Sequence, residues 1–347
     1  MMMHWLREGL RLARLPGQAL ALAGSARAFC DNPLLGSDRL NRLGLHARRV
    51  ALAQGAAAAR RRWLAGGVSA ADRATFDRDG IVVKRDFLPP ERFARLRAEL
   101  LGLRAPAREH AQGDVLNRLL ALPPAVLGGL PETRAVLASG AWRGLLAYVA
   151  ASRMPPLVFV QSIFAQHREA PPDPQVVLHS DTFFPMVKAW LYLDDVGEGE
   201  GPFQYVAGSH RASPARLAWE QARSLDWRGA DAMSRRGSLR VRPEELAGLG
   251  LGPAVQHVVP ANTLVVADTY GFHARTQGAA GTVRIALWGQ AHSTPFAPVP
   301  LPSPRRLLGG REAVLAWALQ DWLAARGLAH RHWVDRGVRG AGDPPGA

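Results

Sequence analysis

The sequence contains little cysteine, little lysine and no long apolar run. Cys30 is the single cysteine among 347 residues, which excludes a disulfide within the chain and a zinc site built from several thiolates. No apolar stretch reaches the roughly 18 residues that a transmembrane helix needs. We therefore expect a protein of a reducing compartment, the cytoplasm, without a membrane-spanning segment.

Lysine is nearly absent as well. Lys84 and Lys188 are the two lysines, so arginine supplies the other 41 of the 43 basic residues. A formal net charge of +14 would suit an anionic partner, but the abundance of Ala, Arg, Gly and Pro indicates a codon bias toward G and C. Because no nucleic-acid-binding motif is evident, we predict no nucleic-acid partner.

Three parts are expected along the chain. Residues 1–70 read as a helical extension, 71–300 as a β domain with flanking helices, and 301–347 as a C-terminal helix with a flexible tail. Short strands dominate from about residue 157, which predicts a double-stranded β-helix, the jelly roll of the cupins. The expected helices span 40–66, 89–103, 213–225 and 310–326, and the expected substrate loops span 104–135, 164–176 and 225–255.

The N-terminal residues 4–15 can form a helix with one apolar and one basic side. Such a helix fits either peripheral contact with a membrane surface or, as the preferred interpretation, packing on its own domain.

Two metal ligands lie at the end of an apolar run in VVLHSDTFF. Residues two apart on a strand point to the same face, so His179 and Asp181 can both face inward. A third ligand would complete the 2-His-1-carboxylate arrangement of non-haem Fe(II) sites. The candidates for it are His210, His257, His273, His292, His330 and His332.

His273 is favoured as the third ligand because of an arginine downstream in the chain. Eleven residues after His273, Arg284 interrupts the apolar strand TVRIALWG. A buried guanidinium requires a negative partner, and its planar fork matches a carboxylate. That partner is either a dicarboxylic co-substrate bound to the metal or a structural carboxylate, with Asp268 as the candidate.

The motifs LHSD, KAWLYLDDVGEGEGPFQYVAGSHR and GFH, with Arg284 eleven residues on, resemble the phytanoyl-CoA dioxygenase family of Fe(II)/2-oxoglutarate oxygenases. The resemblance covers about residues 75–295. It implies a double-stranded β-helix with Fe(II) on His179, Asp181 and His273, and with Arg284 on the distal carboxylate of 2-oxoglutarate. O2 would be the second co-substrate, and the products would be succinate, CO2 and a hydroxylated small-molecule or lipid-like substrate.

The resemblance also implies roles for neighbouring residues. Trp190 takes the place of an aromatic beside the co-substrate, although a core tryptophan is an equal interpretation, and either Gln161 or Gln166 assists. Relatives that halogenate lack the acidic ligand, so the presence of Asp181 favours hydroxylation. Some relatives carry a small hydroxyl residue where this chain has Arg275. With Arg168, that arginine suggests an anionic substrate, or else it pairs with a surface carboxylate.

Two other functions remain open. One is a catalytically inactive jelly roll that works as a binding or scaffold protein, and the other is a cupin-like metal enzyme that does not use 2-oxoglutarate. The complete ligand set argues against the first and Arg284 against the second.

Overall fold

A computed structural model describes residues 16–292, 294–301 and 307–346 of the chain. The helix predicted over residues 4–15 lies outside this range. No helix in the described part is both long and apolar enough to cross a membrane.

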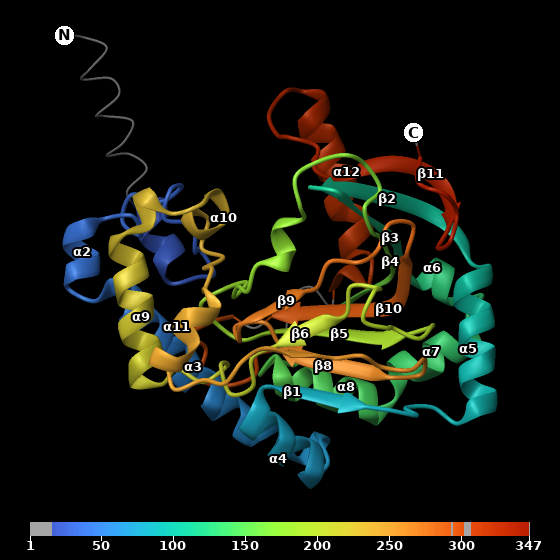
Figure 1. The fold of residues 1–347 in the computed structure, drawn as a ribbon, viewed down its shortest axis with the longest axis horizontal. Helices are drawn as coiled ribbons and strands as arrows, with labels where there is room; N and C mark the ends of the chain where they lie inside the picture. Colours follow the sequence, from blue (N-terminus) through green and yellow to red (C-terminus); the bar gives the residue numbers. More distant parts are fainter. Residues whose placement is uncertain (1–15, 293, 302–306, 347) are drawn as a thin grey trace.

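Two antiparallel sheets form the centre of the molecule (Figure 1). The strands are β1 (Ile81–Lys84), β2 (Arg104–Gln112), β3 (Val115–Ala121), β4 (Leu157–Phe164), β5 (Met186–Tyr192), β6 (Phe203–Tyr205), β7 (Val255–Gln256), β8 (Leu264–Asp268), β9 (His273–Arg275), β10 (Val283–His292) and β11 (Val334–Gly340). The larger sheet has the order β1-β8-β5-β10-β4-β3-β2-β11 and the smaller β7-β6-β9. From β5 to β10 the chain passes repeatedly between the two sheets, which confirms the predicted double-stranded β-helix.

Helices surround the two sheets. Within the described residues, the α-helices are α2 (Asp38–Arg42), α3 (Leu45–Leu64), α4 (Ala70–Asp79), α5 (Pro90–Gly102), α6 (Pro124–Leu127), α7 (Pro131–Ala138), α8 (Gly140–Val149), α9 (Pro214–Leu225), α10 (Ala232–Arg235), α11 (Pro243–Gly248) and α12 (Glu312–Ala325). The four predicted helices are confirmed as α2–α3, α5, α9 and α12. The first of them breaks at Gly44, whose φ of 87° is the left-handed conformation that glycine adopts without strain.

The outer face of the larger sheet carries the main apolar core. Leu191 on β5 and Leu287 on β10 belong to a buried cluster that includes Trp142 and Leu146 of α8. A Cβ at Gly289 would lie 2.9 Å from the Trp142 ring, so glycine lets α8 approach β10 closely. This packing holds the outer face of β5 and β10 against α8, and the inner face of these strands is directed toward the smaller sheet.

The N-terminal helices pack mainly against α9. Figure 1 shows α2, α9, α10 and α11 gathered on one side of the sheets, with α3 running beneath them. His46 of α3 lies 2.7 Å from Glu220 of α9, which also pairs with Arg216 at 3.0 Å, and all three side chains are buried. Ser213 caps α9, because its hydroxyl accepts from the amide of Arg216.

Two segments differ from the expectations. Part of the supposed loop over 104–135 forms β2 and β3, which extend the larger sheet. Residues 334–340, expected at a flexible end, form β11 and pair with β2. The sequence gives little sign of β11, because most of its residues are polar or glycine. The strand forms because its backbone pairs with the edge of β2.

Candidate metal centre

The backbone brings His179 and His273 side by side. The amide of His179 donates to the carbonyl of His273 at 2.9 Å, and the amide of His273 donates back to His179 at 2.9 Å. His179 was expected at the end of a regular strand, but it forms isolated bridges to His273 and Arg240, and β5 begins only at Met186. The pairing of two distant segments, rather than strand alternation alone, therefore aligns the two imidazoles.

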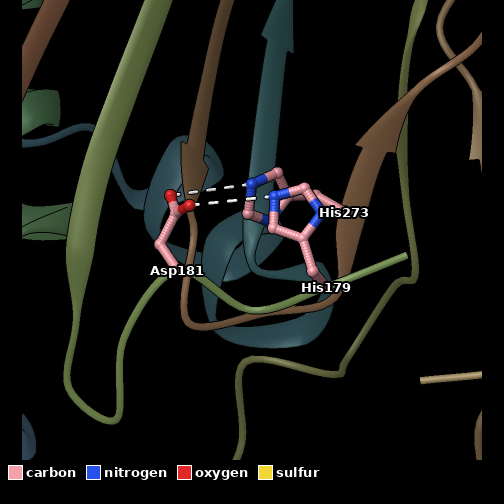
Figure 2. A group of neighbouring side chains, drawn as sticks. All are labelled: His179, Asp181 and His273. Atoms are coloured by element: carbon pink, nitrogen blue, oxygen red, sulfur yellow. Dashed lines mark ion pairs between the residues drawn. The ribbon is translucent and has the colours of Figure 1, made fainter. Parts of the chain in front are cut away.

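Asp181 completes a three-ligand group with these histidines (Figure 2). One ligand atom from each of the three residues lies within 4.8 Å of the others. The Asp181 oxygens are 3.8 Å from Nε2 of His179 and 3.6 Å from Nε2 of His273. Figure 2 shows both rings turned toward the carboxylate. Within the described parts of the chain, none of the other five candidate histidines joins a group of this kind.

Each imidazole is oriented by a backbone carbonyl. Nδ1 of His179 lies 2.7 Å from the carbonyl of Val177, and Nδ1 of His273 lies 3.0 Å from the carbonyl of Gly271. A carbonyl can only accept, so the proton is on Nδ1 and the Nε2 lone pair is directed at the centre of the group. This arrangement is typical of metal-binding histidines.

The charges of the group also suit a cation. Burial lowers the pKa of His179 well below its usual value and that of His273 to about 4, so both rings are neutral at pH 7. Burial by itself would raise the pKa of Asp181, but the positive charge of Lys188 holds this pKa well below its usual range. Two neutral imidazoles and an ionised carboxylate are a donor set that binds divalent transition metals.

Lys188 is a site residue that the sequence analysis missed. Its Nζ lies 2.7 Å from the second oxygen of Asp181. In β5, Lys188 and Trp190 share the face opposite Leu191, so strand alternation already placed this lysine on the inner side. Its contact with Asp181 could not be foreseen, because it depends on how the segment before β5 folds back.

Asp181 and Lys188 line a cavity of about 540 Å³. Its walls combine apolar side chains with polar ones, among them the amides of Gln112, Asn117, Gln161, Gln175 and Gln290. Segments from both ends of the chain contribute, because Ser25 and Arg27 lie on one wall and Trp333 on another. Arg27 also donates to the backbone carbonyl of Asp181.

Arg284 lies on the inner face of β10 and is only 9% exposed. Its guanidinium donates to the carbonyl of Gly201 and lies 5.9 Å from the centre of the Tyr192 ring. Among the described residues it has no carboxylate partner. Asp268, the structural candidate, instead pairs with Arg61 at 3.1 Å. Arg284 is therefore a buried cation that no carboxylate of the described residues neutralises.

The two glutamines differ in position. Gln161 lines the cavity, and its side-chain oxygen accepts from the indole of Trp190 at 3.1 Å. Gln166 is not among the residues that line the cavity, and its amide donates to the carbonyl of Gly278 at 2.9 Å. Gln161 therefore lines the cavity, and Trp190, which is not itself among the lining residues, is tied to it by this hydrogen bond.

The two arginines suggested for an anionic substrate are also separated. Arg275 lines the cavity, but it pairs with the buried carboxylate of Asp173 at 2.6 Å. Arg168 donates to the backbone carbonyl of Gly113 at 2.9 Å and is not among the cavity residues. The Arg275 partner is thus a carboxylate, although a buried one rather than one at the surface.

Three solved structures with similar chains have low identity and low TM-scores. SnoN, described as a non-heme alpha ketoglutarate dependent epimerase from nogalamycin biosynthesis, is 16% identical with a TM-score of 0.41, covering 68% of this chain and 96% of that one. AviO1 from Streptomyces viridochromogenes is 22% identical with a TM-score of 0.39, covering 68% and 97%. Iron-bound HygX from Streptomyces hygroscopicus is 18% identical with a TM-score of 0.37, covering 65% and 87%. These values are too low to transfer a function.

The sequence itself gives the more specific match. No curated protein matches the chain. Residues 76–239, however, match the family model of phytanoyl-CoA dioxygenase (PhyH), and this range contains His179, Asp181 and Lys188. Residues 76–239 are therefore similar to the phytanoyl-CoA dioxygenase family, which confirms the resemblance seen in the motifs.

Proposed function

We propose that the protein is an Fe(II)/2-oxoglutarate-dependent dioxygenase that hydroxylates a small-molecule substrate and releases succinate and CO2. The observation that carries this proposal is the convergence of His179, Asp181 and His273 within 4.8 Å at the edge of a cavity, inside a chain whose residues 76–239 are similar to the phytanoyl-CoA dioxygenase family. The complete ligand set disfavours an inactive scaffold.

The three side chains would hold the iron through two Nε2 atoms and one carboxylate oxygen. Three protein ligands on one side of a metal leave positions free for a co-substrate and O2. Iron, 2-oxoglutarate and O2 would together supply the oxidising chemistry, while the protein supplies position and a pocket of controlled polarity. Lys188 would hold the second Asp181 oxygen, and this would keep the carboxylate in one orientation.

Arg284 would bind the distal carboxylate of 2-oxoglutarate. The guanidinium is buried without a carboxylate partner among the described residues, and a dicarboxylate would supply the missing charge. Trp190 and Gln161, already joined by a hydrogen bond, would form the wall beside the co-substrate. A cupin-like enzyme that uses no 2-oxoglutarate would have no use for this arginine.

The substrate would enter the cavity beside Asp181. Its many amide side chains favour a polar molecule over a bare acyl chain, which is the lipid-like alternative. Lys188 and Arg275 are already paired with carboxylates, so an anionic group of the substrate would meet Arg27 instead. A hydroxyl product is proposed because Asp181 occupies the position that halide takes in halogenating relatives.

We propose that this oxygenase domain spans residues 71–300, with residues 1–70 and 301–347 as additions. Ser25, Arg27 and Trp333 support a contribution of both additions to the cavity wall. We propose a cytoplasmic location, because a chain with a single cysteine is compatible with a reducing compartment.

The test is succinate formation by iron-loaded protein with 2-oxoglutarate and O2, in the absence of a substrate. Wild type should form succinate slowly, and Asp181→Ala should lose both this activity and iron binding, because a carboxylate ligand is removed. Asp194→Ala, which removes a half-exposed carboxylate paired with Arg97, is the matched control and should behave as wild type. A wild-type protein that binds neither iron nor 2-oxoglutarate would refute the proposal.

A further inference from the structure

The region around α12 exposes an unusual number of large apolar side chains. Seven of them occur within residues 307–328: Leu307, Leu308, Val314, Leu315, Leu319, Trp322 and Leu328. On α12 itself, Leu315 is 48% exposed, Leu319 57% and Trp322 50%. Their spacing of four and seven residues places these three side chains on one face of the helix. Apolar patches of this kind mark surfaces that bind a partner.

The opposite face of α12 fastens the helix to the domain. Ala313 and Trp317 pack against the inner core cluster, and Trp317 lies 5.8 Å from Phe159 between ring centres. Asp321 pairs with Arg108 of β2 at 2.6 Å. Figure 1 shows α12 beside β2 and β11 at one end of the molecule. The exposed face of the helix therefore points away from the sheets.

Cations flank this apolar face. Arg311 precedes α12 and Arg326 follows it, and both are exposed. The Arg326 guanidinium lies 3.9 Å from the Trp322 ring centre, so a cation and an apolar ring are in direct contact on this surface. α12 contains two acidic residues: Asp321 faces inward and is paired with Arg108, and Glu312 follows Arg311 in the first turn, so the two arginines outnumber the acidic group on the outward side. The patch therefore combines apolar side chains with positive charge.

We propose that the outward face of α12 docks onto an anionic lipid bilayer. Leu315, Leu319 and Trp322 would enter the region between headgroups and acyl chains, and Arg311 and Arg326 would contact lipid phosphates. The net charge of +14 favours approach to such a surface. A second copy of the chain fits less well, because apposed faces would bring the same cations together. With 14 residues, α12 lies on the membrane rather than across it.

The test is co-sedimentation of the full-length protein with vesicles of mixed phosphatidylcholine and phosphatidylglycerol. Wild type should pellet with these vesicles, less with pure phosphatidylcholine and less at high salt, because exposed charges are screened. The triple variant L315Q/L319Q/W322Q should bind at least about tenfold more weakly, because the inserted apolar groups are lost. Its helix content and unfolding midpoint should match wild type, since all three side chains face outward.

A matched control removes exposed apolar side chains from another surface. L52Q/W63Q changes two residues of α3 that are 65% and 67% exposed, and it should bind vesicles as wild type does. The variant W5Q/L6Q/L10Q tests the N-terminal segment and should also keep most of the binding.

Three results would overturn the proposal. The first is that wild type stays in the supernatant, and the second is that the triple variant pellets as fully as wild type. The third is that wild type forms a dimer in solution, does not bind vesicles, and becomes a monomer in the triple variant. Succinate formation by the triple variant should equal that of wild type, so failure here is distinguishable from failure of the proposed activity.

Discussion

The two faces of the eight-stranded sheet differ although the same strands build both: the outer face carries the main apolar core, and the inner face combines a smaller apolar cluster with charged and amide groups. On β10, Leu287 points outward into the apolar cluster under α8, whereas Arg284 points inward as a buried cation. On β5, Leu191 is part of the outer cluster and Lys188 reaches the carboxylate of Asp181. Because successive side chains of a strand point to opposite faces, neighbouring residues of β5 and β10 belong either to the outer apolar core or to the face that carries the site.

The difference shows where this fold carries its unfavourable groups. The outer face is filled with apolar side chains and stabilises the domain by their burial. The inner face keeps charged and amide groups that folding alone would disfavour, such as Arg284 without a carboxylate partner in the described chain. Substitutions on the outer face should change stability, and substitutions on the inner face should change ligand binding.

The largest effect on stability is expected for Leu287→Ala. The side chain is fully buried between β10 and α8, so its truncation should lower the free energy of unfolding by about 2–5 kcal/mol. Urea denaturation would measure this loss, and the remaining folded protein should bind iron with wild-type affinity. Leu287→Met is the control, with an expected cost below about 1.5 kcal/mol. Equal stability of the Ala variant and wild type would contradict the assignment of the outer face.

The comparable change on the inner face is Arg284→Met. It should weaken 2-oxoglutarate binding about 100-fold, equivalent to about 2.7 kcal/mol, because the distal carboxylate loses its partner. Titration calorimetry with Mn(II)-loaded protein under anaerobic conditions would measure the affinity. The unfolding midpoint should stay the same or rise, since an unpaired buried charge is removed. Arg284→Lys should bind with intermediate affinity, because it keeps the charge and loses the fork. Unchanged affinity in the Met variant would place the carboxylate elsewhere.

A smaller effect is expected at a buried histidine away from the metal centre. Burial, with Arg61 and Arg211 nearby, lowers the pKa of His210 to about 3. The unfolded chain, with a histidine pKa of about 6.5, therefore takes up a proton before the folded state does as the pH falls. This group should destabilise the protein progressively between pH 6.5 and 3, by about 2 kcal/mol at pH 5.

His210→Asn should remove that part of the pH dependence. The difference in unfolding free energy between pH 7 and pH 5 would be measured by urea denaturation of both proteins, and the variant should lose about 2 kcal/mol less than wild type. Identical pH profiles would mean that His210 titrates normally in the folded protein.

Much of the site could be foreseen because it depends on local patterns. The HxD pair, a histidine before a glycine-rich turn and an arginine in an apolar strand are visible in the sequence, and His179, Asp181 and His273 do meet. The choice between Gln161 and Gln166 could not be made, since it depends on which of them faces the cavity. Lys188 was missed for the same reason, because its partner lies on a segment that folds back.

The sequence by itself determined most of the strands from β4 onward, the four predicted helices and the identity of the ligand side chains, since periodicity, capping and residue chemistry act over a few neighbours. Only the tertiary structure decided that β11 would close the edge of β2, that residues 25 and 27 would reach the cavity, and that Arg275 would pair with Asp173. Those contacts join residues up to more than two hundred positions apart, and their geometry is set by how whole elements pack.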